Sequence, residues 1–514
     1  MHFQIPLLLL CASCLAASGN LAPADQPEIL TPPPLLIPRV NGPTIFGVRP
    51  NAPFLYTIPA TGQRPMTFGV EHLPQGLTVD GVTGRITGKL TAAGEYQVVL
   101  RASNALGAAE KNFRILCGDR IALTPPLGWN SWNSWAGSVD QEKVMSSARV
   151  LVSSGLINHG WTYVNIDDTW QGKRGGPHQA ILANEKFPAM KQLCDDVHAL
   201  GLKIGIYSTP WVTSYAGFRG GSADEANGQW EKQKDFHGNW RLGRHSFAKN
   251  DAAQWADWGF DYLKYDWNPN DVEHTKEMSL ALRATGRDIV LSLSNAAPIA
   301  HAAEFSQWAN AWRTTGDIWD TWETPGKYQY SVSEIGFSQD AWTQYGAPGH
   351  WNDPDMLVVG WVGWGPHLHA TRLSPDEQYS HISLWSMLSA PLLIGCDLER
   401  LDAFTLNLLS NDEVLAINQD ALGQPARRVA TIGPVDVYSR PLEDGATAVG
   451  FFNRGDTPQN ITFKLERIAL RGARKVRDVW RQKDVGEFSS ELPVSIEPHG
   501  VMLYHVSKGA TPES

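Results

Sequence analysis

The chain has 514 residues, of which 42% are hydrophobic and 19% charged, and its formal net charge is −10. This length exceeds that of one ordinary domain, so two or three domains are expected. The acidic balance argues against nucleic acid or an anionic membrane as a partner, because both would repel the chain. The 21 tryptophans are unusual. Flat apolar rings with one hydrogen-bond donor can stack on the faces of sugars, although many tryptophans can also be buried in a large core.

Residues 1–19 are predicted to form an export signal, with a short apolar core at Pro6–Leu10 and small residues at Ala16–Gly19. Cleavage there predicts a secreted or periplasmic protein, whereas lipidation of Cys14 predicts a lipid-anchored surface protein. No later apolar run is long enough to form a transmembrane segment. The cysteines beyond the signal have neither a disulfide framework nor metal-ligand spacing, so no metal is expected; they are Cys117, Cys194 and Cys396.

Residues 20–38 are rich in proline and read as a linker. Residues 39–118 then contain short strand-like runs separated by turn signals, among them Phe54–Ile58, Met66–Val70 and Gln97–Arg101. This pattern predicts a small immunoglobulin-like β-sandwich without the paired cysteines. We expect it to act as a spacer or docking module, because it carries no recognisable chemical motif.

Strand-like and helical segments alternate over residues 122–422, which is typical of parallel βα units. One helix is expected to run to Ser153 from a capping box formed by Ser138 and Gln141, and another to end at Gly259. Eight candidate strands predict an α/β fold, a (β/α)8 TIM barrel with its active site at the carboxyl ends of the strands. They are Leu127–Trp129, Tyr163–Ile166, Leu202–Tyr207, Tyr262–Tyr265, Ile289–Leu293, Ala311–Thr314, a segment around His350–Trp351, and Leu392–Gly395.

Strand-like runs return over residues 425–507 and predict a C-terminal antiparallel β-sandwich. The runs are Val435–Tyr438, Ala448–Asn453, Ile461–Leu465 and Val501–His505.

Charged residues follow several of the barrel strands. Desolvating a charge at the end of a buried strand is costly, so a functional role is the expected reason for these residues. Lys264 and Asp266 end the fourth strand, and their spacing allows both side chains to point to one side. Asp167–Asp168 follow the second strand, and Arg313 and Asp317 follow the sixth. Paired carboxylates among aromatic residues are typical of a glycosidase site. No Gly-rich nucleotide loop or metal motif accompanies them, so no cofactor is expected.

Six motifs together resemble glycoside hydrolase family 27, which contains the α-galactosidases and the α-N-acetylgalactosaminidases. In chain order they are Leu127–Trp132, Asn165–Asp168, Lys264–Asp266, Arg313–Asp317, Trp351–Leu357 and Ala416–Asp420. The resemblance covers about residues 123–507. It implies a retaining exo-glycosidase that removes terminal α-linked galactose-type sugars from a carbohydrate partner by double displacement.

The resemblance also implies a role for each matching residue. Asp266 is the expected nucleophile, and Asp317 is the expected acid/base. The expected substrate contacts are Asp167 and Asp168 at the 4- and 6-hydroxyls, Lys264 at the 3- and 4-hydroxyls, Arg313 near the 2-position, Ser294 and Ala297 beside the 2-substituent, Trp132 and Tyr207 as apolar walls, and Asp355 after the seventh strand.

The residues leave other interpretations open. Asp167–Asp168 could cap a helix instead of binding a sugar, and Asp355 could shape its own loop as readily as contact substrate. Four further tryptophans either line additional sugar subsites or pack in the core; they are Trp319, Trp322, Trp361 and Trp364.

Two departures from the family pattern bear on specificity. Many relatives have a disulfide between positions that correspond to Tyr215 and Asn268, so this chain lacks that bridge. Ser294 and Ala297 match the small pair of the N-acetylgalactosaminidases, whereas α-galactosidases often carry a bulkier pair. α-Galactosidase activity is expected first on the family's prevalence, and α-N-acetylgalactosaminidase second. The remaining alternatives are a β-L-arabinopyranosidase, an isomalto-dextran-type activity, and a carbohydrate-binding surface protein without catalysis.

Overall fold

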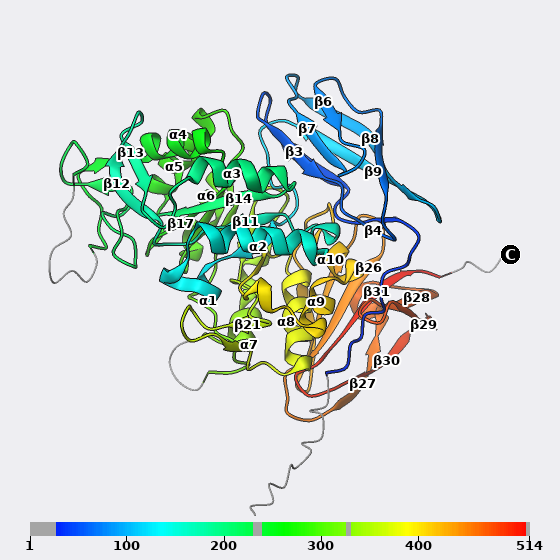
Figure 1. Cartoon of the computed structure of the whole chain (residues 1–514). Coiled ribbons are helices and arrows are strands. Elements are labelled where there is room, and N and C mark those ends of the chain that lie inside the picture. The colour runs from blue at the N-terminus through cyan, green and yellow to red at the C-terminus, as the bar shows by residue number, and fades with distance from the viewer. Residues whose placement is uncertain (1–26, 230–238, 325–329, 510–514) are drawn as a thin grey trace, which may run out of the picture.

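A computed structural model describes residues 27–229, 239–324 and 330–509. Figure 1 shows an N-terminal β module at the top, a central barrel, and a C-terminal β domain at the lower right. The predicted signal over residues 1–19, together with Cys14, lies outside the described residues. In the part of the chain that the structure describes, no helix has the length and apolarity needed to cross a membrane.

The N-terminal module consists of two facing sheets with strand orders β2-β9-β8-β5 and β3-β7-β6, and a short pair β1-β4. Phe54, Ile86 and Phe113 are among the side chains that fill the space between the sheets. The strands are β1 Arg39–Val40, β2 Ile45–Val48, β3 Phe54–Thr57, β4 Ala60–Thr61, β5 Thr67–Glu71, β6 Leu77–Val79, β7 Arg85–Gly88, β8 Gly94–Asn104 and β9 Gly107–Cys117.

The barrel contains all eight predicted strands in one parallel sheet of order β20-β19-β18-β17-β14-β11-β10-β23. The ring closes where Leu357, after β20, pairs in parallel with Ile394. The α/β barrel prediction is therefore confirmed. The strands are β10 Leu127–Asn130, β11 Tyr163–Asn165, β14 Lys203–Ser208, β17 Tyr262–Asp266, β18 Val290–Ser294, β19 Ala311–Arg313, β20 Trp351–Asp353 and β23 Leu392–Ile394.

Helices connect and cover these strands, and short hairpins extend the loops at their carboxyl ends. The helices are α1 Trp132–Trp135, α2 Gln141–Ser153, α3 Met190–Ala199, α4 Ala248–Trp258, α5 Val272–Ala284, α6 Ala302–Trp308, α7 Val332–Gly336, α8 Pro375–Met387, α9 Ala403–Leu409 and α10 Asp412–Asn418. The hairpins pair β12 Gln171–Gly175 with β13 Ala180–Ala183, β15 Ser222–Ala223 with β16 His245–Ser246, and β21 Trp361–Val362 with β22 His369–Ala370.

The start of α2 corrects one prediction. Asp140, rather than Ser138, is the N-cap, and its carboxylate accepts a hydrogen bond from the Lys143 amide at 2.9 Å. Ser138 instead ends a preceding 3-10 turn and donates its hydroxyl to the Trp135 carbonyl at 2.6 Å. The predicted stop of α4 is confirmed, because Gly259 adopts a left-handed φ of 106° directly after the helix.

The C-terminal domain packs an antiparallel sheet of order β24-β25-β26-β31-β28-β29 with the pair β27-β30. Trp480, Phe452 and Leu503 of this domain belong to the same core cluster as the barrel residues, so the two domains share an interior. The strands are β24 Arg427–Ile432, β25 Val435–Pro441, β26 Thr447–Asn453, β27 Gln459–Lys464, β28 Arg474–Asp478, β29 Lys483–Phe488, β30 Glu491–Ile496 and β31 Val501–Lys508.

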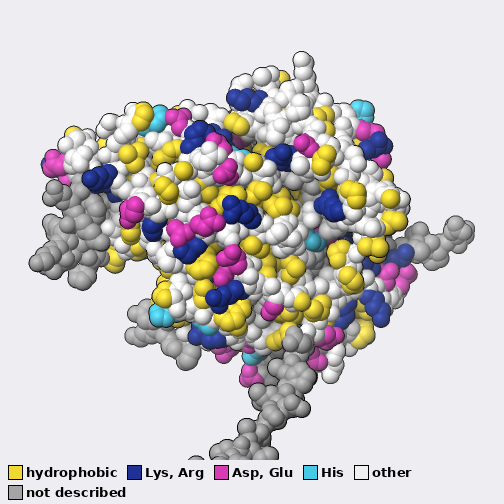
Figure 2. Space-filling model, in the orientation of Figure 1, with side chains coloured by type: hydrophobic (Ala, Val, Ile, Leu, Met, Phe, Trp, Pro, Cys, Tyr) yellow, Lys and Arg dark blue, Asp and Glu magenta, His cyan; other side chains and the backbone are white. Residues whose placement is uncertain are grey.

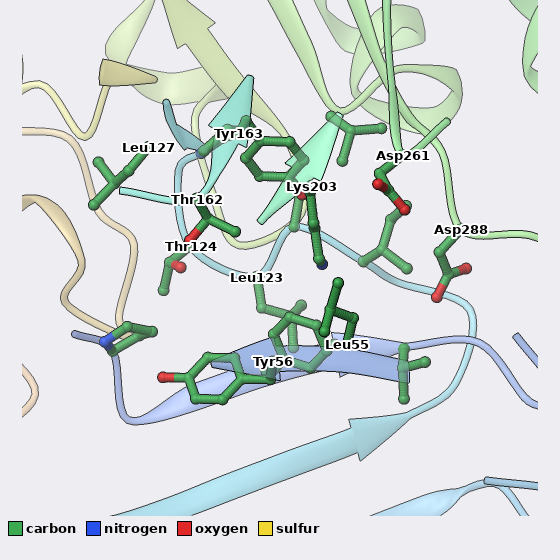
Figure 3. A pocket seen from close by; sticks show the side chains of 18 of the residues that line it. Leu55, Tyr56, Leu123, Thr124, Leu127, Thr162, Tyr163, Lys203, Asp261 and Asp288 are labelled. Carbon is green, nitrogen blue, oxygen red and sulfur yellow. The ribbon is translucent and has the colours of Figure 1, made fainter. Parts of the chain in front are cut away.

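The N-terminal module covers the barrel at the amino ends of its strands. A cavity of about 310 Å³ lies in this interface, and Figure 3 shows Lys203 reaching into it between the two domains. The Lys203 ammonium lies 4.7 Å from the Phe46 ring centroid and 5.6 Å from that of Tyr163. Because Lys203 and Tyr163 begin their strands, this cavity lies at the end of the barrel opposite the predicted catalytic rim.

A buried ion pair ties the β12 hairpin to α4 beside that rim. Arg174 and Asp251 make two contacts of 2.6 and 3.1 Å, and their side chains are 1% and 0% exposed. Asp251→Ala is expected to lower the free energy of unfolding by about 3–5 kcal/mol, because it leaves the arginine buried and unpaired. Urea denaturation followed by tryptophan fluorescence measures this change. The double variant Arg174→Met/Asp251→Leu should lose less, and equal losses would contradict the explanation.

Candidate active site

Asp266 is the last residue of β17, and its side chain is almost completely enclosed at 7% exposure. The Tyr207 hydroxyl, from the end of β14, donates to Asp266 Oδ2 at 3.0 Å. The other oxygen, Oδ1, is buried and has no hydrogen-bond partner among the described residues. Asp266 therefore has one oxygen held in place by a hydrogen bond and one whose hydrogen-bonding capacity is unused. The sequence predicted Tyr207 only as an apolar wall and missed this hydrogen bond.

The environment of Asp266 balances burial against nearby charges. The pKa of Asp266 is raised to about 7: burial and the charges of Asp317 and Asp167 raise it, and Lys264 and the Tyr207 hydrogen bond lower it. Lys264 donates to Asp167 Oδ2 at 2.8 Å. Burial lowers the pKa of Lys264, but the charges of Asp167 and Asp266 raise it above its usual value. Lys264 thus contacts Asp167 directly and acts on Asp266 through its charge.

Asp317 lies on the loop after β19 and is more open to solvent than Asp266. Its side chain is 40% exposed, and Arg313 Nη2 donates to its Oδ1 at 3.2 Å. The same guanidinium contacts Asp355 Oδ2 at 2.9 Å. The structure therefore brings an enclosed carboxylate, Asp266, and an accessible one, Asp317, to the same rim.

Asp355 makes contacts that favour positioning over substrate binding. It is 4% exposed, and its Oδ2 accepts both the Arg313 guanidinium and the Ile318 amide, the latter at 2.8 Å. The backbone of Asp355 has a left-handed φ of 84°, and its amide donates to Asp353 Oδ1 at 2.8 Å. Because Ile318 follows the acidic residue at 317, Asp355 fixes the loop that carries that acid.

The pair Asp167–Asp168 does not cap a helix, because strand β12 follows it. Asp168 is 1% exposed, and its oxygens accept the Thr169 amide at 2.6 Å, the Gln171 amide group at 2.9 Å and the Ala216 amide at 3.1 Å. Burial raises the pKa of Asp168, and these donors oppose that rise. Asp168 thus joins the loops after β11 and β14 at the rim, whereas Asp167 faces Lys264.

Two small side chains lie near Asp266 on the side of the fifth barrel strand. Ser294 ends β18 directly opposite Asp266 in the strand register and is 2% exposed. Ala297 is 5% exposed, and its amide donates to the Arg313 carbonyl at 2.8 Å. The chain therefore has short side chains at both positions that the resemblance relates to the 2-substituent.

The two positions that the resemblance relates to a disulfide, Tyr215 and Asn268, make other contacts in this chain. Asn268 donates its side-chain amide to the Asn295 carbonyl at 2.9 Å, which joins the loops after β17 and β18. Tyr215 instead packs against Trp211 and Trp240, with ring centroids 5.2 and 5.6 Å away.

The tryptophans at the rim divide into two groups. Trp132 is half-buried and lies 5.9 Å from Trp364, which in turn lies 5.9 Å from Trp319 (ring centroids). Trp322 is 6% exposed against Phe337, which supports the core-packing interpretation for that residue. Among the described residues, no group of three or more His, Cys, Asp or Glu side chains could hold a metal ion.

Known families and structures match most of the chain. The barrel matches the family model described as alpha galactosidase A over residues 124–241 and 240–420. Residues 432–506 match the alpha galactosidase C-terminal beta sandwich domain, and residues 34–116 match an Ig domain model. The alpha-galactosidase 2 of Arabidopsis thaliana is 36% identical over 403 residues, which are 77% of this chain and 92% of that protein.

Two crystal structures give the same result. A Bacteroides fragilis protein, provisionally assigned as an alpha-galactosidase, is 33% identical with a TM-score of 0.81, covering 94% of this chain and 100% of its own. Alpha-galactosidase I from Mortierella vinacea is 31% identical with a TM-score of 0.66, covering 76% of this chain and 98% of its own. The matched barrel and C-terminal domain, with Asp266 and Asp317 on one rim, place the chain in the alpha-galactosidase family, glycoside hydrolase family 27.

Proposed function

We propose that the protein is a retaining exo-glycosidase that hydrolyses terminal α-linked D-galactose from oligosaccharides or glycoconjugates. The observation that carries this proposal is the pairing of the enclosed Asp266 with the accessible Asp317 on one rim. A retaining glycosidase needs two carboxyl groups of this kind, one as a nucleophile and one as an acid/base.

In the first step, Asp266 Oδ1 attacks the anomeric carbon while the glycosidic bond breaks. The proton of Asp317 moves to the departing oxygen, and a glycosyl-enzyme forms on the face opposite the leaving group. In the second step, Asp317 takes a proton from water, the water oxygen attacks the same carbon, and Asp266 leaves as a carboxylate. Two inversions give net retention.

The surrounding charges suit these roles. Lys264 favours the ionised form of Asp266 in the free site, and its ammonium can also donate to sugar hydroxyls. Arg313 is held by Asp355, so it can orient Asp317 without a rearrangement during the reaction. We infer that Asp167 and Asp168 bind the 4- and 6-hydroxyls; Asp168 does so from a position already fixed by the loops after β11 and β14.

The substrate assignment is tested by assaying aryl α-D-galactoside and aryl α-N-acetylgalactosaminide in parallel. The small side chains Ser294 and Ala297 favour the second sugar as an alternative, because short side chains fill less of the region that the resemblance relates to the 2-substituent. We expect the galactoside to have the higher kcat/KM. A higher value for the N-acetyl sugar would transfer the assignment to it, and turnover of neither by folded protein would contradict both.

A further proposal concerns location. Cleavage within the signal predicted over residues 1–19 would give a secreted or periplasmic enzyme, and lipidation of Cys14 would give a surface-anchored one. The mass of the mature N-terminus, measured after expression with its native leader, distinguishes the two.

Tyr207→Phe is expected to move the acidic limb of the pH profile of kcat/KM to higher pH. The Tyr207 hydroxyl donates to Asp266 Oδ2 and lowers the pKa of that carboxyl. With this hydrogen bond in place, burial and the neighbouring charges leave the pKa at about 7. Without this donor the pKa of Asp266 rises, so the nucleophile becomes protonated at a higher pH. The profile of wild-type and variant enzyme on one aryl galactoside measures the shift. An unchanged limb would show that a group other than Asp266 controls it.

A further inference from the structure

An exposed tryptophan lies two residues after Asp317, on the side from which a leaving group would depart. Trp319 is 48% exposed, and its ring lies 5.9 Å from that of Trp364. Trp364 in turn contacts Trp132, which the family resemblance places against the galactose ring. The three indoles therefore form a continuous row from the galactose position outward past Asp317.

A cavity of about 340 Å³ opens beside this row. This volume lies within the range of about 300–1,000 Å³ that is typical of small-molecule sites. Trp319 and Trp364 form its walls together with apolar side chains, and polar groups stand among them. The apolar lining residues are Ile318, Val358 and Val362, and the polar ones are Asn133, Asp320, His367, His369 and Arg372.

The backbone holds Trp364 in a conformation that bulky residues rarely adopt. Its φ is 59°, in the left-handed region. The amides of Gly363 and Trp364 donate to the Asn133 carbonyl at 2.9 and 3.0 Å, and the Gly365 amide donates to the Ser134 carbonyl at 3.0 Å. Three successive hydrogen bonds thus fix the loop above α1. Strained conformations of this kind cluster at ligand sites, where the surrounding structure enforces them.

The loop that carries Trp319 is fastened to the same hairpin. Asp320 is 5% exposed and accepts the Arg372 guanidinium at 2.7 Å, the Arg372 amide at 2.9 Å and His369 Nε2 at 3.1 Å. His369 lies in β22, whose partner strand β21 leads into Trp364. The two indoles are therefore pre-positioned relative to each other before any ligand binds.

We propose that Trp319 and Trp364 form a binding site for a leaving-group sugar, the pyranose ring joined to galactose through the scissile bond. This inference rests on the proposed function, because Asp317 must protonate the oxygen that connects the two rings. The indole faces would contact the apolar face of that ring. The side chains of Asn133, His367 and Arg372 would form hydrogen bonds with its hydroxyls. Core packing does not account for these two tryptophans, because both side chains are partly exposed.

The test compares two galactosides that depend equally on Asp317 but differ in the size of the leaving group. α-D-Galactopyranosyl-(1→6)-D-glucose releases a sugar, whereas methyl α-D-galactoside releases methanol, and both departing alkoxides need a proton. Trp319→Ala is expected to lower kcat/KM for the disaccharide about tenfold, the scale of losing one well-packed aromatic contact. The value for the methyl galactoside should stay within about twofold of wild type.

The matched control is Trp240→Ala. Trp240 is 51% exposed and lies on the loop after β14, where it contacts Tyr215. Its removal should leave the ratio of the two kcat/KM values unchanged. If Trp240→Ala rather than Trp319→Ala lowered the disaccharide value selectively, the leaving-group site would lie on the other side of the rim.

The remaining outcomes separate the inference from the proposed function. Equal losses for both galactosides in Trp319→Ala would make Trp319 a positioning residue for Asp317 and overturn the sugar site. An unchanged ratio in an active variant would overturn it as well. If the wild-type protein hydrolysed neither galactoside, the proposed function would fail, and the leaving-group site would fall with it.

Discussion

Replacing Asp266 by alanine is expected to lower kcat for α-galactosides at least about 10⁴-fold, the scale seen when a nucleophile is removed from a catalytic set. The loss follows because no other carboxylate oxygen at the rim is both buried and without a partner among the described residues in the way that Asp266 Oδ1 is. Initial rates with an aryl α-galactoside measure it. Added azide should restore turnover and give the β-galactosyl azide, since the small anion attacks from the vacated side.

The unfolding temperature of the Asp266→Ala variant shows whether a loss of activity reflects a loss of folding. Burial holds the pKa of Asp266 at about 7, above its ordinary 3.8, so the ionised carboxylate opposes folding at neutral pH. That opposition is complete above the folded-state pKa of about 7, weakens as the pH falls below 7, and is lost once the pH is below the ordinary value of 3.8. At pH 8 the alanine variant should therefore unfold at the same temperature as the wild type or higher. Retained wild-type activity in this folded protein would remove Asp266 as the nucleophile.

Asp317→Ala is expected to have an effect that depends on the leaving group. For a sugar leaving group, loss of the proton donor should lower kcat/KM by about 10²–10⁴-fold, the usual contribution of general acid catalysis. For an activated aryl galactoside, the first step should be nearly unaffected, and the slow step should become hydrolysis of the glycosyl-enzyme. Kinetics on both substrate types measure the difference.

Azide distinguishes Asp317 from the nucleophile by stereochemistry. In the Asp317 variant the glycosyl-enzyme still forms, so azide should attack it from the leaving-group side and give the α-galactosyl azide. A β-product from this variant would contradict the assignment of the two roles. Arg313, which contacts Asp317 at 3.2 Å, remains paired with Asp355 in the variant and should keep the loop in place.

The barrel could be predicted from the sequence because its buried parallel strands are short apolar runs between helical segments. Burial on both faces leaves strands such as Leu392–Ile394 almost wholly apolar, and this signal is local. The same locality explains why the residues at the strand ends were identified: a charge such as Asp266 stands out directly after an apolar run.

Features that depend on tertiary partners could not be predicted in the same way. Ser138 and Asp140 both suit a helix cap, and only the 3-10 turn before α2 places Asp140 at its start. Asp168 resembles a cap in sequence, yet its donors include Ala216, from a loop 48 positions away. Asp355 could not be assigned between substrate and structure until its contact with Ile318 was known.

The leaving-group cavity illustrates the same limit at longer range. Trp319 and Trp364 are separated by most of a βα unit, and they meet because Asp320 fastens one loop to the β21–β22 hairpin. A tryptophan count suggests sugar binding in general. It does not show which indoles share a surface.

The contacts of Asn268 and Tyr215 have a consequence for how the protein can mature. A disulfide between these two positions would need an oxidising compartment to form, whereas an amide hydrogen bond and aromatic contacts need none. The described cysteines are buried and free, and burial raises the pKa of their thiols, to about 12 for Cys396, so they resist conversion to disulfides. In the described residues, oxidative folding is therefore no part of building this catalytic rim.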